Sequence, residues 1–316
     1  MLVLKMSSAS RLPIGMLEND MDRGLSGWLN GFIGVLIFSG SLPATRLAVI
    51  GFDPLFLTVA RGTIAGLLSL CLLLAFRQKR PQSSEIFSLV IVALGCVVGF
   101  PLLTALALQH ISSAHSVVFI GLLPLATAIF GVIRGGERPK AAFWFFAILG
   151  SLLVTGFALA QGGASIGVGA ASIGLSFGDW LMLAAIIVCG LGYAEGAALS
   201  KRLGGWQVIC WALVISLPVM AVGALALMPE TFAGVGGPAY AGLAYVSLFS
   251  MLIGFIFWYR GLAQGGTATV GQLQLIQPFF GLALAALLLG ETVTSSMFIV
   301  TLGVVLCVAA AKRFAR

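Results

Sequence analysis

The sequence predicts an all-α integral membrane protein in which ten transmembrane helices form two inverted five-helix repeats around a central cavity. Three observations lead to this prediction: an apolar composition, ten apolar runs of membrane-spanning length, and a motif that occurs twice. Of the 316 residues, 60% are hydrophobic and 9% are charged, whereas about a quarter of the residues of a soluble domain are charged. The chain has too few charges to cover a water-facing surface, so lipid is the solvent that suits it.

Ten apolar runs have about the 20 residues that are needed to cross roughly 30 Å of hydrocarbon. Helices are expected because a backbone in lipid must satisfy its own hydrogen bonds. The run LLSLCLLL at 67–74 does not alternate as the strands of a membrane barrel do. The predicted spans are residues 25–45, 54–76, 86–108, 113–133, 140–160, 177–199, 206–228, 239–260, 268–290 and 295–312.

The basic residues indicate the orientation of these spans. An even number of spans places both termini on one side, together with the loops at 77–85, 134–140, 200–205 and 260–267. Of the 17 Lys and Arg residues, all but Arg46 and Arg61 lie on that side. Because positive loops stay inside, both termini are predicted to be cytoplasmic.

The predicted spans also divide the chain into two tails, two repeats and a linker. We expect a polar cytoplasmic tail over 1–24, whose mixed charges are unlike a cleaved signal peptide, and a short tail at 313–316. Residues 25–160 and 177–312 are the two predicted five-helix repeats. The uncharged Gly/Ala/Ser-rich stretch 161–176 is the predicted outer linker between them.

A proline–glutamate motif supports the repeat. Glu137 follows Pro124 by 13 residues, as Glu291 follows Pro278, and the two motifs are 154 residues apart. Because five spans is an odd number, the second copy enters the membrane in the opposite direction. Such inverted repeats build many secondary transporters, in which the halves exchange conformations to expose a site alternately to the two sides.

With these residues the chain resembles the drug/metabolite transporter superfamily, specifically its ten-helix EamA-type members. The resemblance rests on LP…GER at 123–138 and QP…GET at 277–292, and it extends to ALALQ at 105–109 and WYRGL at 258–262. It implies a central cavity and export of amino acids or related metabolites across a bacterial inner membrane.

An ionisable residue inside a span is a functional candidate, because a charge at the helix centre costs about 2.5 kcal/mol or more. Glu195, among the glycines of GLGYAEG, is predicted to carry a coupling proton or to bind a substrate amine. The alternative is a carboxyl tied to a neighbouring helix or facing the cytoplasmic vestibule. Arg61 is a candidate for a substrate carboxylate. Arg46 is the weaker candidate, because it can reach the headgroups or pair with Asp53.

The remaining candidates are polar or aromatic. Gln274 and Gln277 share a helix face from which Gln272 points away, so they line a cavity or bond to another helix. Candidates that contact the solute, with loop solvation or interface anchoring as alternatives, are His115, Tyr193, Trp258 and Tyr259. Pro124 and Pro278 are predicted helix breaks with a gating role. Glu137 and Glu291 are predicted to end helices and pair with local charges.

Other functions find less support. A GxxxxGK[ST] loop for an ATP-driven pump does not occur, nor does the HExxH of a zinc protease. GLSFG at 174–178 fits a hydrolase serine motif, but both histidines precede it. The five cysteines lie in apolar runs without CxxC spacing, so no disulfide and no metal site is predicted. We therefore expect no enzyme, cofactor or nucleic acid. The expected partners are lipid, a small polar solute and protons, for a monomer or homodimer. A facilitative importer or channel-like carrier is the alternative, and a membrane hydrolase or scaffold is a distant one.

Overall fold

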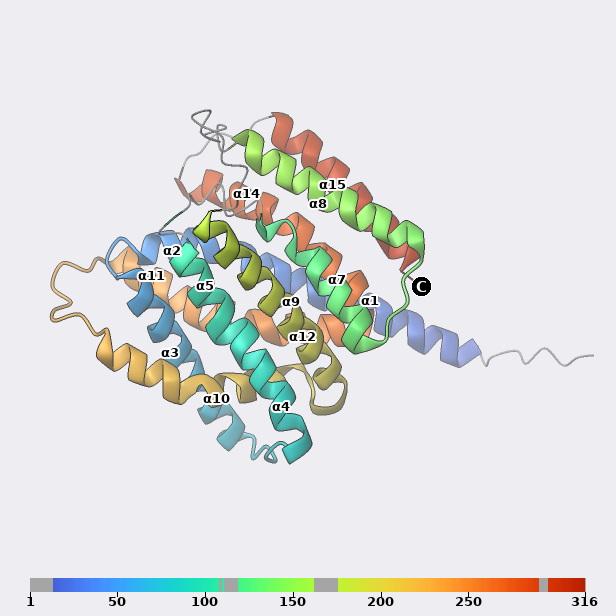
Figure 1. Ribbon diagram of the computed structural model, residues 1–316. Helices are drawn as coiled ribbons and strands as arrows, with labels where there is room; N and C mark the ends of the chain where they lie inside the picture. The colour runs from blue at the N-terminus through green and yellow to red at the C-terminus, as the bar shows by residue number, and fades with distance from the viewer. Residues whose placement is uncertain (1–13, 108–109, 111–118, 162–175, 290–294, 316) are drawn as a thin grey trace, which may run out of the picture.

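The computed structural model describes residues 14–107, 110, 119–161, 176–289 and 295–315 (Figure 1). All regular structure among these residues is helical. The elements are α1 (Ile14–Ser39), α2 (Ser41–Ala48), α3 (Pro54–Ala75), α4 (Ser83–Val92), the π-helix η1 (Ala93–Gly99), α5 (Phe100–Ala107), α7 (Leu123–Gly135), α8 (Ala141–Gln161), α9 (Phe177–Leu203), α10 (Gly205–Ala226), α11 (Gly237–Tyr245), the π-helix η2 (Val246–Ile253), α12 (Gly254–Gly265), α13 (Thr267–Gly271), the 3₁₀-helix η3 (Gln272–Ile276), α14 (Gln277–Leu289) and α15 (Ser295–Phe314).

Several of these helices are long and apolar enough to cross a membrane. Among the described residues there are 6 such stretches: Gly24–Thr45, Pro54–Ala75, Ser83–Thr104, Phe177–Leu203, Gly205–Ala226 and Gly237–Gly265. Shorter apolar helices cover Leu123–Gly135 and Ala141–Gly156. The chain is therefore a multi-pass, all-helical membrane protein, as its composition predicts.

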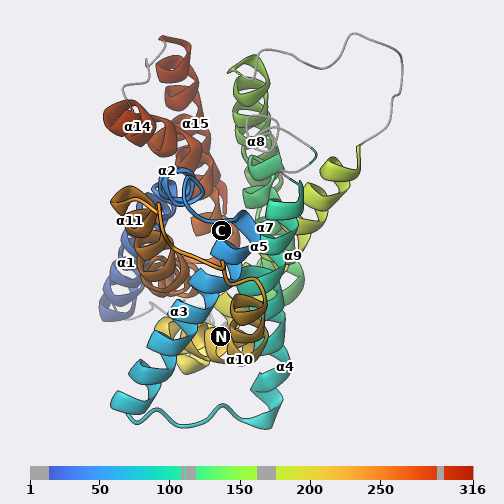
Figure 2. The same cartoon turned by 90° about the vertical axis from the view of Figure 1, so that its left-hand side faces the viewer.

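The basic loops gather at one end of the bundle, which we call the basic end. Here α1 begins, and α3, α7, α9, α12 and α15 end. The Lys312 ammonium lies 4.2 Å from the centroid of the Trp28 ring, and the rings of Phe76 and Trp206 are 5.6 Å apart. In Figure 2, α4, α5, α7 and α9 lie along one side of the molecule and α1, α2 and α11 along the other. The termini of the described chain thus share the basic end.

The first predicted span, 25–45, consists of two helices that meet at Gly40. The Tyr245 hydroxyl donates a hydrogen bond of 2.9 Å to the carbonyl of Ile37. A Cβ at residue 40 would lie only 2.3 Å from the same hydroxyl oxygen. The tyrosine therefore fills the space beside Gly40, and it shares the Ile37 carbonyl with the Gly40 backbone nitrogen, which donates to it at 3.2 Å.

Two spans carry π-helical turns at equivalent places. Residues 93–99 of η1, moved along the chain by the repeat distance of 154, become 247–253, which lie within η2. In the first of these turns a Cβ at Gly95 would lie 2.4 Å from the Val188 carbonyl oxygen of α9. A π-turn is rare and often marks a functional region. Here η1 packs against α9 and α10, and η2 packs against α3 and α1.

Small residues allow α1 and α12 to pack closely. Each helix has a GxxxG pattern, at 27–31 and 261–265, and the patterns face each other. A Cβ at Gly261 would lie 2.5 Å from the backbone nitrogen of Gly31. Lipid provides little hydrophobic drive for helix association, so close backbone packing of this kind holds the helices together.

Gly261→Ala is expected to separate α1 from α12 and to lower the free energy of unfolding by about 1–3 kcal/mol, the usual cost of overpacking. Thermal unfolding of the purified protein in detergent measures this. The matched control is Gly156→Ala, because a Cβ at Gly156 meets nothing within 4 Å. Equal midpoints for the two variants would contradict this packing.

Candidate functional site

An aromatic–amide cluster lies in the interior, where α1, α9, α12 and η3 meet. We define it as Phe38, Tyr193, Phe255, Trp258 and Gln274. The Trp258 ring centroid is 5.5 Å from that of Tyr193 and 6.2 Å from that of Phe38, with edge-on geometry. Trp258 is fully buried, and Gln274 is 5% exposed. The sequence candidates Tyr193 and Trp258 are thus brought together by α9 and α12, and Gln274 of η3 lies within reach of the Tyr193 hydroxyl.

Two polar groups of this cluster have no partner. The Trp258 indole nitrogen and both polar atoms of the Gln274 amide are buried and lack a hydrogen bond within the described chain. The neighbouring Gln272 amide, fully buried, is in the same state. Native proteins pair most buried polar atoms, since an unpaired one costs about 1–3 kcal/mol. Donors and acceptors left available in this way can bind a polar solute.

The 3₁₀-helix that carries Gln274 has a local cause. In an α-helix the carbonyl of Gln274 would accept from the nitrogen of residue 278, but that residue is Pro278, which has no N–H. The carbonyl instead bonds the nitrogen of Gln277, one residue earlier, which is the 3₁₀ pattern. Pro278 thereby changes the helix at the point where the amides face inward. Pro124 likewise occupies the first turn of α7.

Other sequence candidates lie elsewhere or have other roles. The Tyr259 hydroxyl is 3.3 Å from both the Cys96 sulfur and the Gly192 carbonyl oxygen, so it ties α12 to η1 and α9. Gln277 is half-buried at the start of α14. His115, Glu291 and the Arg46 side chain lie outside the described part of the chain.

Arg61 is a half-buried cation inside the α3 span. Its Nε atom is buried and has no hydrogen-bond partner within the described residues. An arginine in a membrane span usually pairs with an acid or a carbonyl. This unpaired Nε–H remains suited to a carboxylate of a solute.

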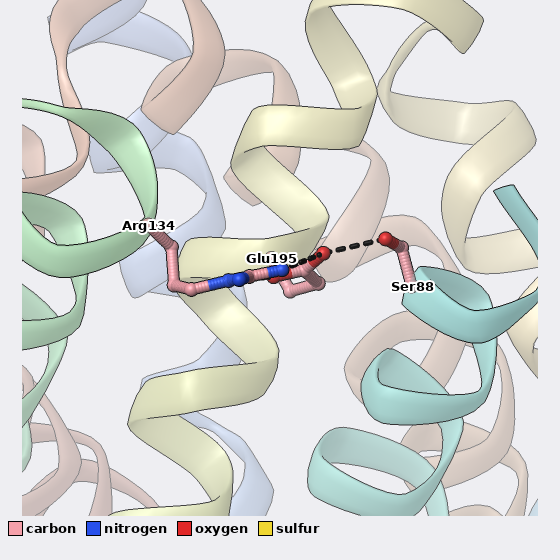
Figure 3. A network of polar contacts seen from close by, with 3 residues as sticks. All are labelled: Ser88, Arg134 and Glu195. Carbon is pink, nitrogen blue, oxygen red and sulfur yellow. Dashed lines mark hydrogen bonds and ion pairs between the residues drawn. The ribbon is translucent and has the colours of Figure 1, made fainter. Parts of the chain in front are cut away.

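A second polar group surrounds Glu195 near the basic end (Figure 3). Its Oε2 accepts from Arg134 Nε at 2.7 Å, and its Oε1 accepts from Arg134 Nη2 at 3.0 Å. The Ser88 hydroxyl donates to Oε1 at 2.5 Å. The Glu195 side chain is 5% exposed and that of Arg134 is 45% exposed. The bidentate ion pair joins α7 to α9, and the serine adds α4.

Sequence reasoning selected Glu195 but missed both of its partners. Arg134 counted only as one of the basic residues that orient the chain, and Ser88 is an ordinary polar residue of a span. The alternative in which Glu195 is tied to a neighbouring helix describes its geometry in this structure.

Known proteins resemble this chain in sequence and in fold. The sequence model of the EamA-like transporter family matches residues 25–159 and again residues 176–311. The chain belongs to the EamA-like transporter family. The resemblance drawn from the two proline–glutamate motifs is thereby confirmed, and the family and the names of its members indicate a transporter rather than an enzyme.

Relatives of this EamA-like protein are also called transporters. It is 64% identical to the uncharacterized transporter YdeK of Bacillus subtilis strain 168. The match extends over 296 residues, which are 94% of this chain and 100% of that protein. The chain is 23% identical to a probable terminal-alkyne amino-acid exporter of Streptantibioticus cattleyicolor, over 81% of this chain and 83% of that one. A protein of known crystal structure, 20% identical, matches with a TM-score of 0.73 over 92% of this chain and 98% of the other, which supports the fold alone.

Arg134→Gln leaves the Glu195 carboxylate buried without its counter-ion. Because Arg134 is partly solvated, we expect a loss of about 1–2 kcal/mol in the free energy of unfolding, less than for a fully buried pair. Adding Glu195→Gln to the same protein is expected to recover part of this loss. A double-mutant cycle on thermal unfolding measures the coupling. Arg138→Gln, at an exposed arginine four residues further along the chain, serves as the control, and additive effects would contradict the pairing.

Proposed function

We propose that this EamA-like transporter exports a small polar metabolite, an amino acid or a related compound, by alternating access between two inverted five-helix halves. The observation that carries the proposal is the buried, unpartnered amide and indole of Gln274 and Trp258 at the junction of helices from both ends of the chain. The relative named as an amino-acid exporter supports the substrate class.

The inverted repeat has several supports. The family model matches the chain twice, and the π-turns η1 and η2 stand one repeat distance apart. The C-terminal turn of α7 packs on the start of α13, so these two helical runs, which carry the two proline motifs, point in opposite directions. We assign residues 25–160 and 177–312 to the ten-helix pair of halves and 161–176 to the outer linker. Both termini are proposed to lie on the cytoplasmic side of the inner membrane.

The chemistry of the cluster suits an amphipathic solute. The Gln274 amide and the Trp258 indole can donate to a carboxylate or carbonyl, and Arg61 offers a guanidinium for a carboxylate. The rings of Phe38, Tyr193 and Trp258 can contact an apolar side chain or the face of an ammonium group. A solute of this kind would satisfy the polar atoms that the protein leaves unpaired.

Glu195 is the proposed coupling residue. Its ion pair with Arg134 joins α7 of the first half to α9 of the second. A proton on the carboxylate would remove one of the two charges and weaken this link. Proton binding at Glu195 would therefore favour separation of the halves at the basic end, which couples a proton gradient to solute movement.

Trp258→Phe keeps an aromatic ring but removes the indole N–H. We expect about tenfold weaker binding of the transported solute, since one hydrogen bond contributes roughly 1.4 kcal/mol. A thermal-shift screen of amino acids on the purified protein identifies the solute, and titration of the variant gives the loss. Trp180→Phe is the matched control, because Trp180 is 59% exposed on α9. Failure of every amino acid and related metabolite to stabilise the wild-type protein would contradict the substrate class.

Glu195→Gln preserves the shape of the side chain but cannot take up or release a proton. We expect proteoliposomes with this variant to lose accumulation driven by a pH gradient, while solute counterflow, which needs no net proton movement, persists. Counterflow and pH-driven uptake of the radiolabelled solute are measured side by side. Retention of pH-driven accumulation in the variant would remove Glu195 from coupling and favour a facilitative carrier.

A further inference from the structure

A carboxylate from the first half of the chain caps a helix of the second half at the basic end. Glu137 Oε1 accepts from the backbone nitrogen of Thr267 at 2.5 Å, and its Oε2 accepts from that of Ala268 at 2.7 Å. These are the first two amides of α13, and the first amides of a helix have no partner within it. The positive end of the helix dipole adds to the attraction.

The local backbone directs Glu137 toward this contact. Helix α7 ends at Gly135, and Gly136 has a φ of +66°, the left-handed conformation that turns the chain at a helix end. One turn earlier, Gly131 lets α7 approach α13. A Cβ at that residue would lie 3.1 Å from the Thr267 Cβ and 3.2 Å from the Ala268 nitrogen. The last turn of α7 therefore packs directly on the first turn of α13.

Helix α13 has no side chain of its own to serve as its cap. Serine, threonine, aspartate or asparagine usually fills the N-cap position, but here that position is Gly266, with a φ of +92° and no side-chain hydrogen bond. The chain instead uses a carboxylate 130 residues away. The Glu137 carboxylate thus caps α13 and at the same time joins the two halves of the chain.

The segment capped in this way has a change of helix type immediately behind it. Only the five residues of α13 separate the Glu137 contact from the 3₁₀-helix η3, which carries the unpartnered Gln272 and Gln274 amides. A 3₁₀ stretch inside a longer helix is typical of a hinge. Helix α13 can therefore turn about η3 when its N-terminus is released.

We propose that Glu137 is a latch that holds the basic end closed, and that opening of this end requires the carboxylate to leave the Thr267 and Ala268 amides so that α13 pivots at η3. The inference rests on the proposed alternating access. It makes Glu137 a positioning residue and not a solute ligand. Release is reversible because Glu137 is partly exposed, so water can replace the hydrogen bonds on both sides.

The latch is distinct from the Glu195–Arg134 pair, although both lie at the C-terminal end of α7. Arg134 holds that end to α9 through an ion pair, whereas Glu137 holds it to α13 through backbone amides. Neither Glu195 nor Arg134 takes part in the Glu137 contact. Loss of Glu137 is therefore expected to change the conformational equilibrium without removing the pH response assigned to Glu195.

The test measures from which side of the membrane the interior is accessible. Gln274→Cys serves as the reporter in a protein whose five native cysteines are replaced by serine. Inside-out and right-side-out vesicles are treated with a membrane-impermeant cationic thiosulfonate. Glu137→Ala is expected to raise the labelling rate from the basic end about tenfold, the effect of losing a charge-assisted hydrogen bond, and to lower the rate from the opposite side. Thr267→Pro, which removes one donor where proline is tolerated as the first residue of a helix, is expected to act in the same direction but more weakly.

Glu85→Ala is the matched control. The Glu85 carboxylate accepts from the Gln82 nitrogen at 2.9 Å and caps α4 at the same end, but it does not join the halves. We expect it to leave the ratio of the two labelling rates unchanged. Equal increases from both sides in Glu137→Ala would indicate a loosened structure and overturn the latch, as would unchanged rates.

Hydrogen exchange separates a latch from a simple cap. Both roles predict faster deuterium uptake over 267–271 in Glu137→Ala, but only a latch also predicts the reciprocal change in labelling. Faster exchange with an unchanged labelling ratio would overturn the proposal. The labelling needs no solute, so its result stands even if the screen finds none, whereas the Trp258 titration tests the solute site without reference to Glu137.

Discussion

Lipid cannot hydrogen-bond a peptide group, and the positions where this chain departs from regular α-helix are shaped by that constraint. At Gly40 a tyrosine hydroxyl from α11 bonds the Ile37 carbonyl where α1 ends. Before Pro278 the Gln274 carbonyl accepts a 3₁₀-type hydrogen bond from the Gln277 nitrogen. The π-turns η1 and η2 alter the pairing in two further spans. In each case the chain supplies a substitute partner for the backbone, and η3 also brings unpaired amide side chains into the interior.

The aromatic–amide cluster is unequally divided between the halves. The second half provides Tyr193, Phe255, Trp258 and Gln274, whereas the first half provides Phe38. In the proposed inverted arrangement, the two halves would enclose a cluster that is itself asymmetric. Such a cluster would present different groups to a solute as the halves exchange conformations.

The C-terminal end of α7 and the two residues after it carry two polar contacts between the halves at the basic end. Within four residues, Arg134 binds the Glu195 carboxylate of α9 and Glu137 binds the α13 amides. These charges lie close to water, where ion pairs and hydrogen bonds are weaker and can be exchanged for solvent. A carrier needs contacts of this strength, because interactions as costly to break as those of a dry core would hold it in one conformation.

The amino-acid sequence alone determined that this protein lies in a membrane, that it is helical and that it belongs to its family. These properties depend on composition, on the length of the apolar runs and on motifs spaced along the chain, all of which are local or one-dimensional. It also indicated Gln274, Trp258 and Tyr193, which the structure brings together, because polar and aromatic residues within apolar runs stand out. Periodicity shows which face of a helix a residue occupies, but not which helix lies opposite.

Only the tertiary structure decided which groups the Glu195 and Glu137 carboxylates bind. Glu195 lies 61 residues from Arg134 and 107 from Ser88, and Glu137 lies 130 from Thr267. From the sequence, Glu137 was expected to end a helix and to pair with local charges. In the structure it bonds the backbone of a distant segment. The GxxxG patterns of α1 and α12 are present in the sequence, but only the structure shows that they face each other. Side-chain partners across a helix bundle depend on how the helices are arranged around one another, and that arrangement is settled by the packing of all of them together.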